Sequence, residues 1–284
     1  MKIYLENDKI KAAIDSLGAE CVSMFDKIKR TELIWQGHPD SWAGKAPNLF
    51  PFIGRLKNNA YYHDGKEYKL NIHGFARKSE FAVLQQSKCS VALLLADTPD
   101  TINAYPFKFN FIVKYSLRGN RLTTEYIVKN TDNKDIYFGV GGHPGFNIKG
   151  KSKIVFEKEE QPEQFTFEQT ELLINGIKPY GTLKEMILRK QLFNEDAVLL
   201  TNLKSRCLTL SSENGVNIKF IFGGVPFLAF WTHKKSGDYI CIEPWCGLPD
   251  YFEPAREIKN KKGINRLSPK KEFKYKYIIE TVRN

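Results

Sequence analysis

The chain has 284 residues, of which 42% are hydrophobic and 26% are charged, and its formal net charge is +11. This composition is that of an ordinary globular protein with a substantial core. No run of about 18 apolar residues occurs, so the sequence predicts no membrane-spanning helix. The N-terminus is charged from Lys2 onward and lacks the apolar run of a secretion signal, which predicts a cytoplasmic protein.

The cysteines predict neither disulfides nor a zinc site. Their number is odd and the chain is not small, whereas disulfide frameworks are typical of short secreted chains. Cys241 and Cys246 are five residues apart without a second cysteine pair, a spacing that disfavours zinc. The cysteines are Cys21, Cys89, Cys207, Cys241 and Cys246.

Strand-like patterns recur along the chain, because β-branched and aromatic residues alternate with polar ones between Gly, Asn and Asp. Residues 64–65, Asp-Gly, predict a hairpin turn between 61–63 and 66–70, since this dipeptide tolerates positive φ. A short helix is expected over 182–192. Many strands and no linker predict a single domain over 1–284, an all-β, large antiparallel β-sandwich with few short helices and one concave sheet face for a ligand. Further strands are predicted at residues 109–117, 121–129, 136–140, 153–157, 207–211, 217–222, 227–231, 239–243 and 273–281.

Positive charge is concentrated near the C-terminus, where residues 256–276 contain nine Lys or Arg against two Glu. A solvated basic loop and strand is the simplest interpretation of this stretch. Nucleic-acid binding is a second interpretation, although the sequence contains no recognised nucleic-acid-binding motif. A third is attraction of an anionic ligand such as a sugar phosphate.

Two segments in the first third of the chain carry candidate binding residues. In residues 46–55, two prolines and a glycine bracket an apolar stretch that ends at Arg55, whose guanidinium suits hydroxyls, a carboxylate or a phosphate. The alternative is a structural arginine that ties this loop to a carboxylate. His73 follows the predicted hairpin and precedes Gly74, which allows a ligand or backbone to approach closely. The alternative is that His73 supports the hairpin.

His143 and Glu243 are the candidate catalytic pair. Two glycines leave space beside His143 and Pro144 favours an extended backbone there, while an ordinary pKa of about 6.5 makes imidazole a usable acid. Glu243 follows apolar residues at the predicted end of a strand, where Pro244 is expected to terminate the ladder and Trp245 offers a flat face. Partial burial would raise the carboxyl pKa of Glu243. The alternatives are a core histidine and a solvent-facing glutamate.

Other catalytic signatures do not occur in the sequence. It contains no Walker or Rossmann glycine loop and no G-x-S-x-G motif. No carboxylate is singled out as a glycosidase partner for Glu243. His38, His63 and His233 lack settings comparable to that of His143.

Together these segments resemble the aldose 1-epimerase (galactose mutarotase-like) family, in particular its LacX-like bacterial branch. The likeness spans nearly the whole chain. The resemblance implies a large twisted β-sandwich and an isomerase that interconverts the α and β anomers of free aldoses. The matching segments are residues 18–20, 33–37, 42, 46–51, 54–55, 73–77, 142–146 and 241–245.

By this resemblance, Glu243 is the general base that takes the proton from the anomeric hydroxyl, and His143 is the acid that protonates the ring oxygen. His73 and Arg55 match positions that hold sugar hydroxyls and the region of the ring oxygen. The reaction requires no metal and no cofactor, and we expect neither. We expect the imidazole and the carboxylate to lie about 5–8 Å apart, by analogy with paired glycosidase carboxylates.

The resemblance leaves the substrate open. Galactose mutarotases carry a substrate-binding aspartate between the histidine and the glutamate, for which Asp196 and Asp238 are the candidates here. Arg77 and the positive net charge leave room for a phosphorylated hexose, as in related hexose-6-phosphate epimerases. Trp231 or Trp245 is expected to stack on the sugar, with a place in the sandwich core as the alternative.

Three hypotheses follow. The first is an aldose 1-epimerase that acts on a hexose or hexose 6-phosphate, and the second is a non-catalytic carbohydrate-binding or sensing protein on the same fold. The third is a nucleic-acid-binding protein that uses residues 256–276. The expected partner is a small-molecule sugar, without nucleic acid or membrane, and homodimer formation is left open.

Overall fold

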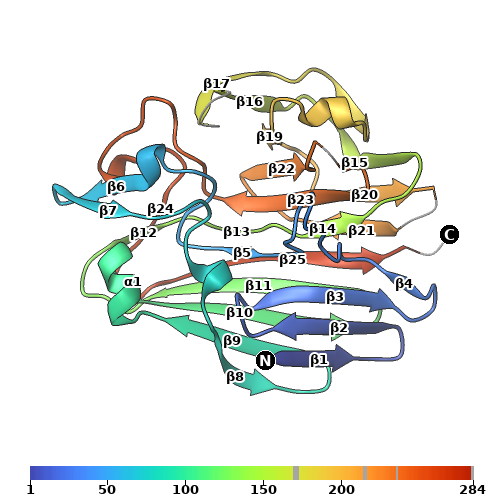
Figure 1. Cartoon of the computed structure of the whole chain (residues 1–284), viewed down its shortest axis with the longest axis horizontal. Coiled ribbons are helices and arrows are strands. Elements are labelled where there is room, and N and C mark those ends of the chain that lie inside the picture. The colour runs from blue at the N-terminus through green and yellow to red at the C-terminus, as the bar shows by residue number, and fades with distance from the viewer. Residues whose placement is uncertain (169–172, 214–215, 235, 283–284) are drawn as a thin grey trace.

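The computed structural model describes residues 1–168, 173–213, 216–234 and 236–282. Two large antiparallel sheets face each other, and three smaller sheets flank them (Figure 1). The nine-stranded sheet has the spatial order β18 (Leu183–Ile187), β15 (Ser152–Glu160), β20 (Cys207–Ser212), β21 (Asn217–Ile221), β25 (Glu272–Thr281), β11 (Arg121–Asn130), β10 (Phe109–Arg118), β9 (Ser90–Ala96) and β8 (Ala82–Gln86). The eight-stranded sheet has the order β17 (Ile174–Pro179), β16 (Glu163–Phe167), β19 (Val198–Thr201), β22 (Phe227–Trp231), β23 (Tyr239–Cys246), β13 (Val140–Gly142) and β5 (Asn48–Leu49), with β14 (Gly145–Asn147) also paired to β23.

The remaining elements are short. The four-stranded sheet consists of β1 (Lys2–Glu6), β2 (Ile10–Asp15), β3 (Glu20–Asp26) and β4 (Thr31–Glu32). Two pairs complete the strands: β6 (Ala60–His63) with β7 (Lys66–Lys69), and β12 (Ile136–Phe138) with β24 (Asn265–Leu267). The helical elements in the described residues are α1 (Pro99–Ala104) and the 3₁₀ turns η1 (Lys57–Asn59), η2 (Ala76–Lys78), η3 (Lys190–Phe193) and η4 (Ile258–Asn260). None of them is long and apolar enough to cross a membrane.

The main hydrophobic core lies between the two large sheets. In β10, alternate residues such as Phe109, Phe111 and Val113 are buried in this core, while Lys114 and Ser116 point outward. The facing sheet contributes alternate residues of β22 and β23. This period-two burial confirms the predicted all-β sandwich.

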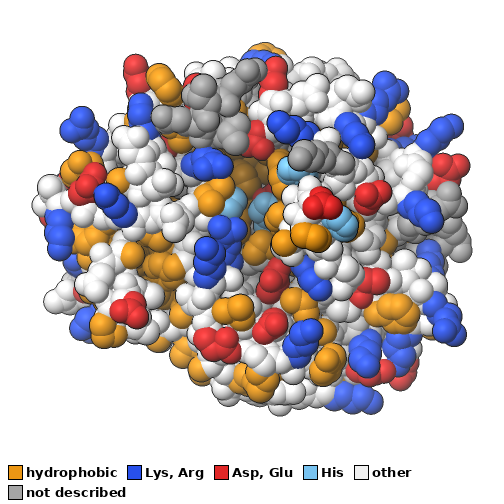
Figure 2. Space-filling view, in the orientation of Figure 1, with side chains coloured by type: hydrophobic (Ala, Val, Ile, Leu, Met, Phe, Trp, Pro, Cys, Tyr) orange, Lys and Arg blue, Asp and Glu red, His pale blue; other side chains and the backbone are white. Residues whose placement is uncertain are grey.

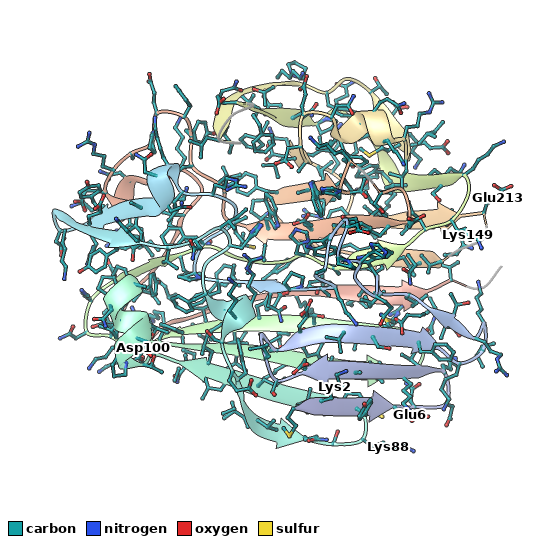
Figure 3. The ribbon with its side chains drawn as sticks, in the orientation of Figure 1. Lys2, Glu6, Lys88, Asp100, Lys149 and Glu213 are labelled. Atoms are coloured by element: carbon teal, nitrogen blue, oxygen red, sulfur yellow. The ribbon has the colours of Figure 1, made fainter. Side chains whose placement is uncertain are left out.

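The segment that follows β14 is fastened to the end of β20 in the nine-stranded sheet. Figure 3 shows Lys149 and Glu213 beside each other there, where the connection after β14 meets the end of β20. The Lys149 N–H donates to Ser212 Oγ at 2.7 Å, and the Glu213 N–H donates to the Lys151 carbonyl at 2.9 Å. The first bond joins the connection after β14 to β20, and the second closes the end of the β15–β20 pair within the nine-stranded sheet.

The predicted helix over residues 182–192 is wrong in its first half, which forms the edge strand β18. Leu183 and Met186 are both buried although three residues separate them, a spacing that imitates a helix. The register of β15 against β18 shifts between Val155 and Glu160, and this irregularity turns both side chains toward the core.

Pro244 does not end its strand, contrary to the prediction, because β23 continues to Cys246. The Ile242 N–H donates to the Pro144 carbonyl, so even-numbered amides of β23 face β13 and β14. The missing N–H of Pro244 therefore falls where the chain leaves β13 and has not yet entered β14. His143 lies in that interruption.

The same alternation determines which side chains leave the core. Ile240 and Ile242 belong to the main core, whereas Cys241, Glu243 and Trp245 stand on the opposite face of the eight-stranded sheet. In the orientation of Figure 1, Figure 2 shows histidine side chains gathered in a hollow near the centre of the molecule, with Lys and Arg around it. The outer face of β23 thus provides the floor for a site.

Candidate active site

The glycines before His143 allow its backbone to pass between crowded neighbours. A Cβ on Gly141 would lie 2.8 Å from the Pro244 carbonyl oxygen, and one on Gly142 would lie 2.9 Å from the hydroxyl of Tyr126. The His143 N–H donates to the Pro47 carbonyl at 3.1 Å, which anchors the histidine to the proline-rich loop. The sequence around His143 is therefore dictated by close backbone packing.

His143 and Glu243 are in direct contact: His143 Nε2 lies 3.2 Å from Glu243 Oε2. The residues are only 8% and 1% exposed. The expected separation of about 5–8 Å was wrong, because glycosidase carboxylates flank a bond between two sugars. In a hemiacetal, the anomeric hydroxyl and the ring oxygen are bonded to the same carbon. The residues that exchange protons with these two oxygens can therefore lie next to each other, on one side of the sugar.

Burial governs the protonation of this pair. Burial lowers the pKa of His143 to about 3. Burial, followed by the negative charge of Asp196, raises the pKa of Glu243 well above the usual carboxyl range. At neutral pH the pair therefore holds one proton, and both shifts favour the neutral pair, with that proton on Glu243.

His73 presents a defined donor to the same space. Its Nδ1 accepts a hydrogen bond from the Gly54 N–H at 3.1 Å, which leaves the ring proton on Nε2. Burial, then the nearby His143 and arginines, lowers the pKa of His73 well below 6.5, so the ring is neutral. A positive φ of 65° at His73 is sparsely populated by non-glycine residues, and it brings the imidazole back over Gly54.

Two arginines and an aspartate complete the polar lining. Arg55 is exposed at the cavity mouth, whereas Arg77 is half-buried and its Nε has no hydrogen-bond partner among the described residues. Asp196 adopts a positive φ of 92° in the connection before β19. Burial raises the pKa of Asp196, and a hydrogen bond with Trp231 opposes this shift.

Aromatic rings surround the His143–Glu243 pair. Trp42 lies 5.0 Å from His143 and 5.8 Å from Trp231, measured between ring centroids. A Cβ on Gly145 would lie 2.7 Å from Trp42 Cζ3, so this glycine admits the indole. The His143 ring is 5.8 Å from Trp231. Trp42 belongs to the segments that carry the family resemblance, but no role in the site was predicted for it, because a tryptophan in a loop has no periodicity to place it.

All seven residues predicted for the site line one cavity of about 280 Å³. This volume is close to the lower end of small-molecule sites. A larger depression of about 950 Å³ beside β15 and β18 has no buried titratable side chain among its described residues, so size alone does not identify a site. The smaller cavity is lined by Trp42, Pro47, Gly54, Arg55, Ile72, His73, Arg77, His143, Phe167, Asp196, Ala197, Trp231, Glu243, Trp245 and Pro249.

A buried ion pair fastens the loop that carries Arg55. Lys261 Nζ lies 2.5 Å from Asp250 Oδ1, and both side chains are 6% exposed. The other oxygen of Asp250 accepts the Lys57 N–H at 2.9 Å, and the Asp250 N–H donates to the Arg55 carbonyl at 2.8 Å. This arrangement holds the backbone that follows Arg55, from its carbonyl to the Lys57 N–H.

The same pair accounts for part of the basic C-terminal stretch. Three of the nine cations in residues 256–276 are engaged inside the chain: Lys261 with Asp250, Arg266 with Asp135 and Lys274 with Glu272. The stretch therefore presents less free positive charge than its composition indicates.

Comparison with known proteins agrees with this architecture. The family model described as Aldose 1-epimerase matches residues 1–279. The chain belongs to the aldose 1-epimerase family. Protein LacX of Lactococcus lactis subsp. lactis, in its plasmid and chromosomal forms, is 30% identical over 296 residues, which cover 98% of this chain and 99% of the relative.

Two solved structures of similar proteins extend the comparison. A galactose mutarotase related enzyme from Lactobacillus acidophilus superposes with a TM-score of 0.95 at 32% identity, over 100% of this chain and 98% of the other. A galactose mutarotase-like protein from Lactobacillus casei gives 0.94 at 28% identity, over 99% and 100%. The expected LacX-like resemblance and sandwich fold are thereby confirmed. Membership in the aldose 1-epimerase family indicates an isomerase type of enzyme with a sugar substrate.

Proposed function

We propose that this protein is a cofactor-free aldose 1-epimerase that interconverts the anomers of a hexose or hexose 6-phosphate. The observation that carries the proposal is the contact between His143 and Glu243, which share one proton inside a cavity lined by donors and indole rings. Ring opening of a hemiacetal requires one proton to leave the anomeric hydroxyl and one to reach the ring oxygen. An acid and a base at adjacent positions suit this exchange.

In the proposed reaction, the Glu243 carboxylate accepts the proton of the anomeric hydroxyl while His143 Nε2 donates a proton to the ring oxygen. The bond between C1 and the ring oxygen breaks and leaves an open-chain aldehyde. Rotation about C1–C2 presents the other face of the carbonyl, and closure reverses both transfers. Each positioned transfer is worth roughly 10²–10⁴-fold in rate. The pair alternates between two states, charged His143 with ionised Glu243 and neutral His143 with protonated Glu243, and the total number of protons on the two residues is the same in both.

The other lining residues bind and orient the sugar in this proposal. His73 Nε2–H and the two arginines, Arg55 and Arg77, donate to sugar oxygens, and Asp196 accepts from a hydroxyl. Indole faces suit the apolar face of a pyranose. The exposed guanidinium of Arg55 supports a phosphorylated hexose among the substrates, since Arg binds phosphate oxygens bidentately.

Anomeric exchange tests the proposal directly. Freshly dissolved α-glucose, α-galactose and their 6-phosphates are followed by polarimetry or exchange NMR with and without the protein. We expect accelerated exchange for at least one of these sugars. A protein that binds a sugar and accelerates the exchange of none of the four would instead be a carbohydrate sensor on this fold.

The pH dependence of kcat/KM is expected to lack an inflection near the ordinary histidine value of 6.5. The pair gains a second proton only as the pH falls toward about 3, because burial depresses the pKa of His143. The pair loses its one proton only above the raised pKa of Glu243. Activity should therefore form a plateau across about pH 5–8. An inflection between about 6 and 7 that tracks His143 would contradict this protonation scheme.

The substitution Asp196→Asn is expected to raise KM by about 10–100-fold with a smaller effect on kcat, since a hydrogen bond to a charged group contributes about 1.5–3 kcal/mol. Asparagine tolerates the positive φ at this position, so the backbone is preserved. The matched control is Asp238→Asn, at an exposed aspartate outside the cavity lining. Equal KM values in both variants would remove Asp196 from the binding site.

A further inference from the structure

A cysteine lies beside the proposed proton-transfer pair without a part in the reaction. Cys241 precedes Glu243 by two residues on β23, so both side chains stand on the same face of the sheet. Cys241 is fully buried. The thiol sulfur, a ring nitrogen of His143 and a carboxylate oxygen of Glu243 all lie within 4.8 Å of one another.

These three donors form a known type of zinc-binding set. Nitrogen, thiolate and carboxylate bind Zn²⁺ at about 2.0–2.3 Å, and three protein ligands with one open position are common in such centres. In a tetrahedral site with these bond lengths, ligand atoms lie about 3.3–3.6 Å apart. The His143–Glu243 distance of 3.2 Å already approaches this value. The Cys241 sulfur lies within 4.8 Å of both atoms, so a shift of roughly 1 Å would bring it to this spacing.

A second observation points to a ligand at this position. Glu243 Oε2 has no hydrogen-bond partner of good geometry among the described residues, and its one polar neighbour is His143 Nε2 at 3.2 Å, although the residue is 1% exposed. Such a buried acceptor is costly unless something binds it. A divalent cation with one thiolate and one carboxylate forms a neutral complex, which suits a buried site better than any charged combination of these groups.

We propose that His143, Cys241 and Glu243 bind Zn²⁺ or a similar thiophilic divalent cation, and that the bound metal inhibits the epimerase. Inhibition rests on the proposed function, because the metal occupies the lone pairs that the proton transfers require. Metal binding displaces two protons, one from the His143–Glu243 pair and one from the Cys241 thiol, so affinity rises with pH. His143 and Glu243 both line the cavity, so a fourth ligand such as water can reach the metal from that side.

The surroundings also set the strength of this site. His143 Nδ1 is buried without a hydrogen-bond partner among the described residues. Tight zinc sites usually bond this second nitrogen to a carboxylate or carbonyl, and loss of that bond costs about 10–100-fold in affinity. We therefore expect the metal to bind reversibly and to inhibit while it is bound, rather than to occupy the site permanently as a structural metal does.

A second group of potential ligands, His63, Asp64 and Glu257, does not carry the same inference. Lys134 Nζ lies 3.3 Å from His63 Nε2, and this cation opposes a metal ion. Both carboxylate oxygens of Glu257 already accept backbone N–H groups, from Asp64 and Gly65.

Cobalt substitution tests the proposal independently of catalysis. The metal-free protein is titrated with Co²⁺, and thiolate ligation is read from a sulfur-to-cobalt charge-transfer band, with Zn²⁺ competing for the same site. We expect one equivalent per chain, at least tenfold weaker binding in Cys241→Ser, and no change in Cys246→Ser, a buried cysteine on the same strand. Glu243→Gln provides a second weakened variant if Cys241→Ser does not fold.

Anomeric exchange gives the functional arm of this test. Zn²⁺ should slow exchange by wild-type protein in proportion to site occupancy, and the ratio of rates with and without Zn²⁺ should return toward one in Cys241→Ser. Mg²⁺, which prefers oxygen ligands, should have no effect. A missing charge-transfer band, or unchanged Co²⁺ affinity in Cys241→Ser, would overturn the metal site. If the charge-transfer band appears but the protein epimerises no sugar, the metal site would be supported and only the proposed activity would be refuted.

Discussion

Replacing Glu243 by Gln is expected to slow anomeric exchange by about 10²–10⁴-fold while sugar binding is largely retained. The amide has the shape of the carboxyl group but cannot accept the proton of the anomeric hydroxyl. Because burial already disfavours the charged form of Glu243, the neutral amide should not impair folding. Loss of kcat with little change in the sugar dissociation constant is the signature of an interaction that matters only in the transition state.

The measurement combines exchange NMR with a titration of sugar binding on the same variant. The matched control is Glu253→Gln, at an exposed position after the same strand, and it should retain the wild-type rate. Full exchange activity in Glu243→Gln would refute the proposed base. A variant that loses binding and rate together would show that Glu243 mainly holds the sugar.

The second large effect concerns stability. Replacing Lys261 by Met is expected to lower the free energy of unfolding by about 3–5 kcal/mol, because it leaves the Asp250 carboxylate buried without its counter-ion. Urea unfolding at neutral pH gives this difference from the midpoint at constant slope. Since the Asp250 backbone also holds the Arg55 carbonyl, KM for the sugar should rise in the folded fraction.

A double variant separates the lost ion pair from other consequences of the substitution. Combining Asp250→Asn with Lys261→Met removes both charges, and it should recover part of the lost stability, as neutral replacements of buried pairs commonly do. The control is Lys259→Met, an exposed lysine in the neighbouring turn, for which we expect a change within about 0.5 kcal/mol. Equal effects at positions 259 and 261 would mean that the buried pair contributes little.

The local parts of this fold could be predicted from the sequence. The hairpin around Asp64 and Gly65 was correct because both residues have positive φ, which their dipeptide favours. β10 and β11 were correct because alternate residues face one large core. β18 was mistaken for a helix, since the irregular register that determines it belongs to its partner strand.

In the site, too, the local features could be predicted from the sequence and the long-range contacts could not. The motifs around His143 and Glu243 indicated the pair, because glycine and proline neighbours are visible locally. Their contact distance, and the place of Asp196 beside them, depend on packing between segments that are far apart in the chain. The buried pairing of Lys261 was hidden within a run of surface-like cations, and only the position of Asp250 reveals it.

The depth at which the Glu243 carboxyl lies has a consequence for the proposed reaction. Enzymes that take up or release hydrogen ions during turnover require a chain of water or side chains to the outside. In the proposed cycle the pair ends with the one proton it had at the start, on the same atom. Because no net proton is exchanged with bulk solvent, the reaction needs no proton pathway to the surface. The near-complete burial of the carboxyl group therefore does not limit the turnover rate.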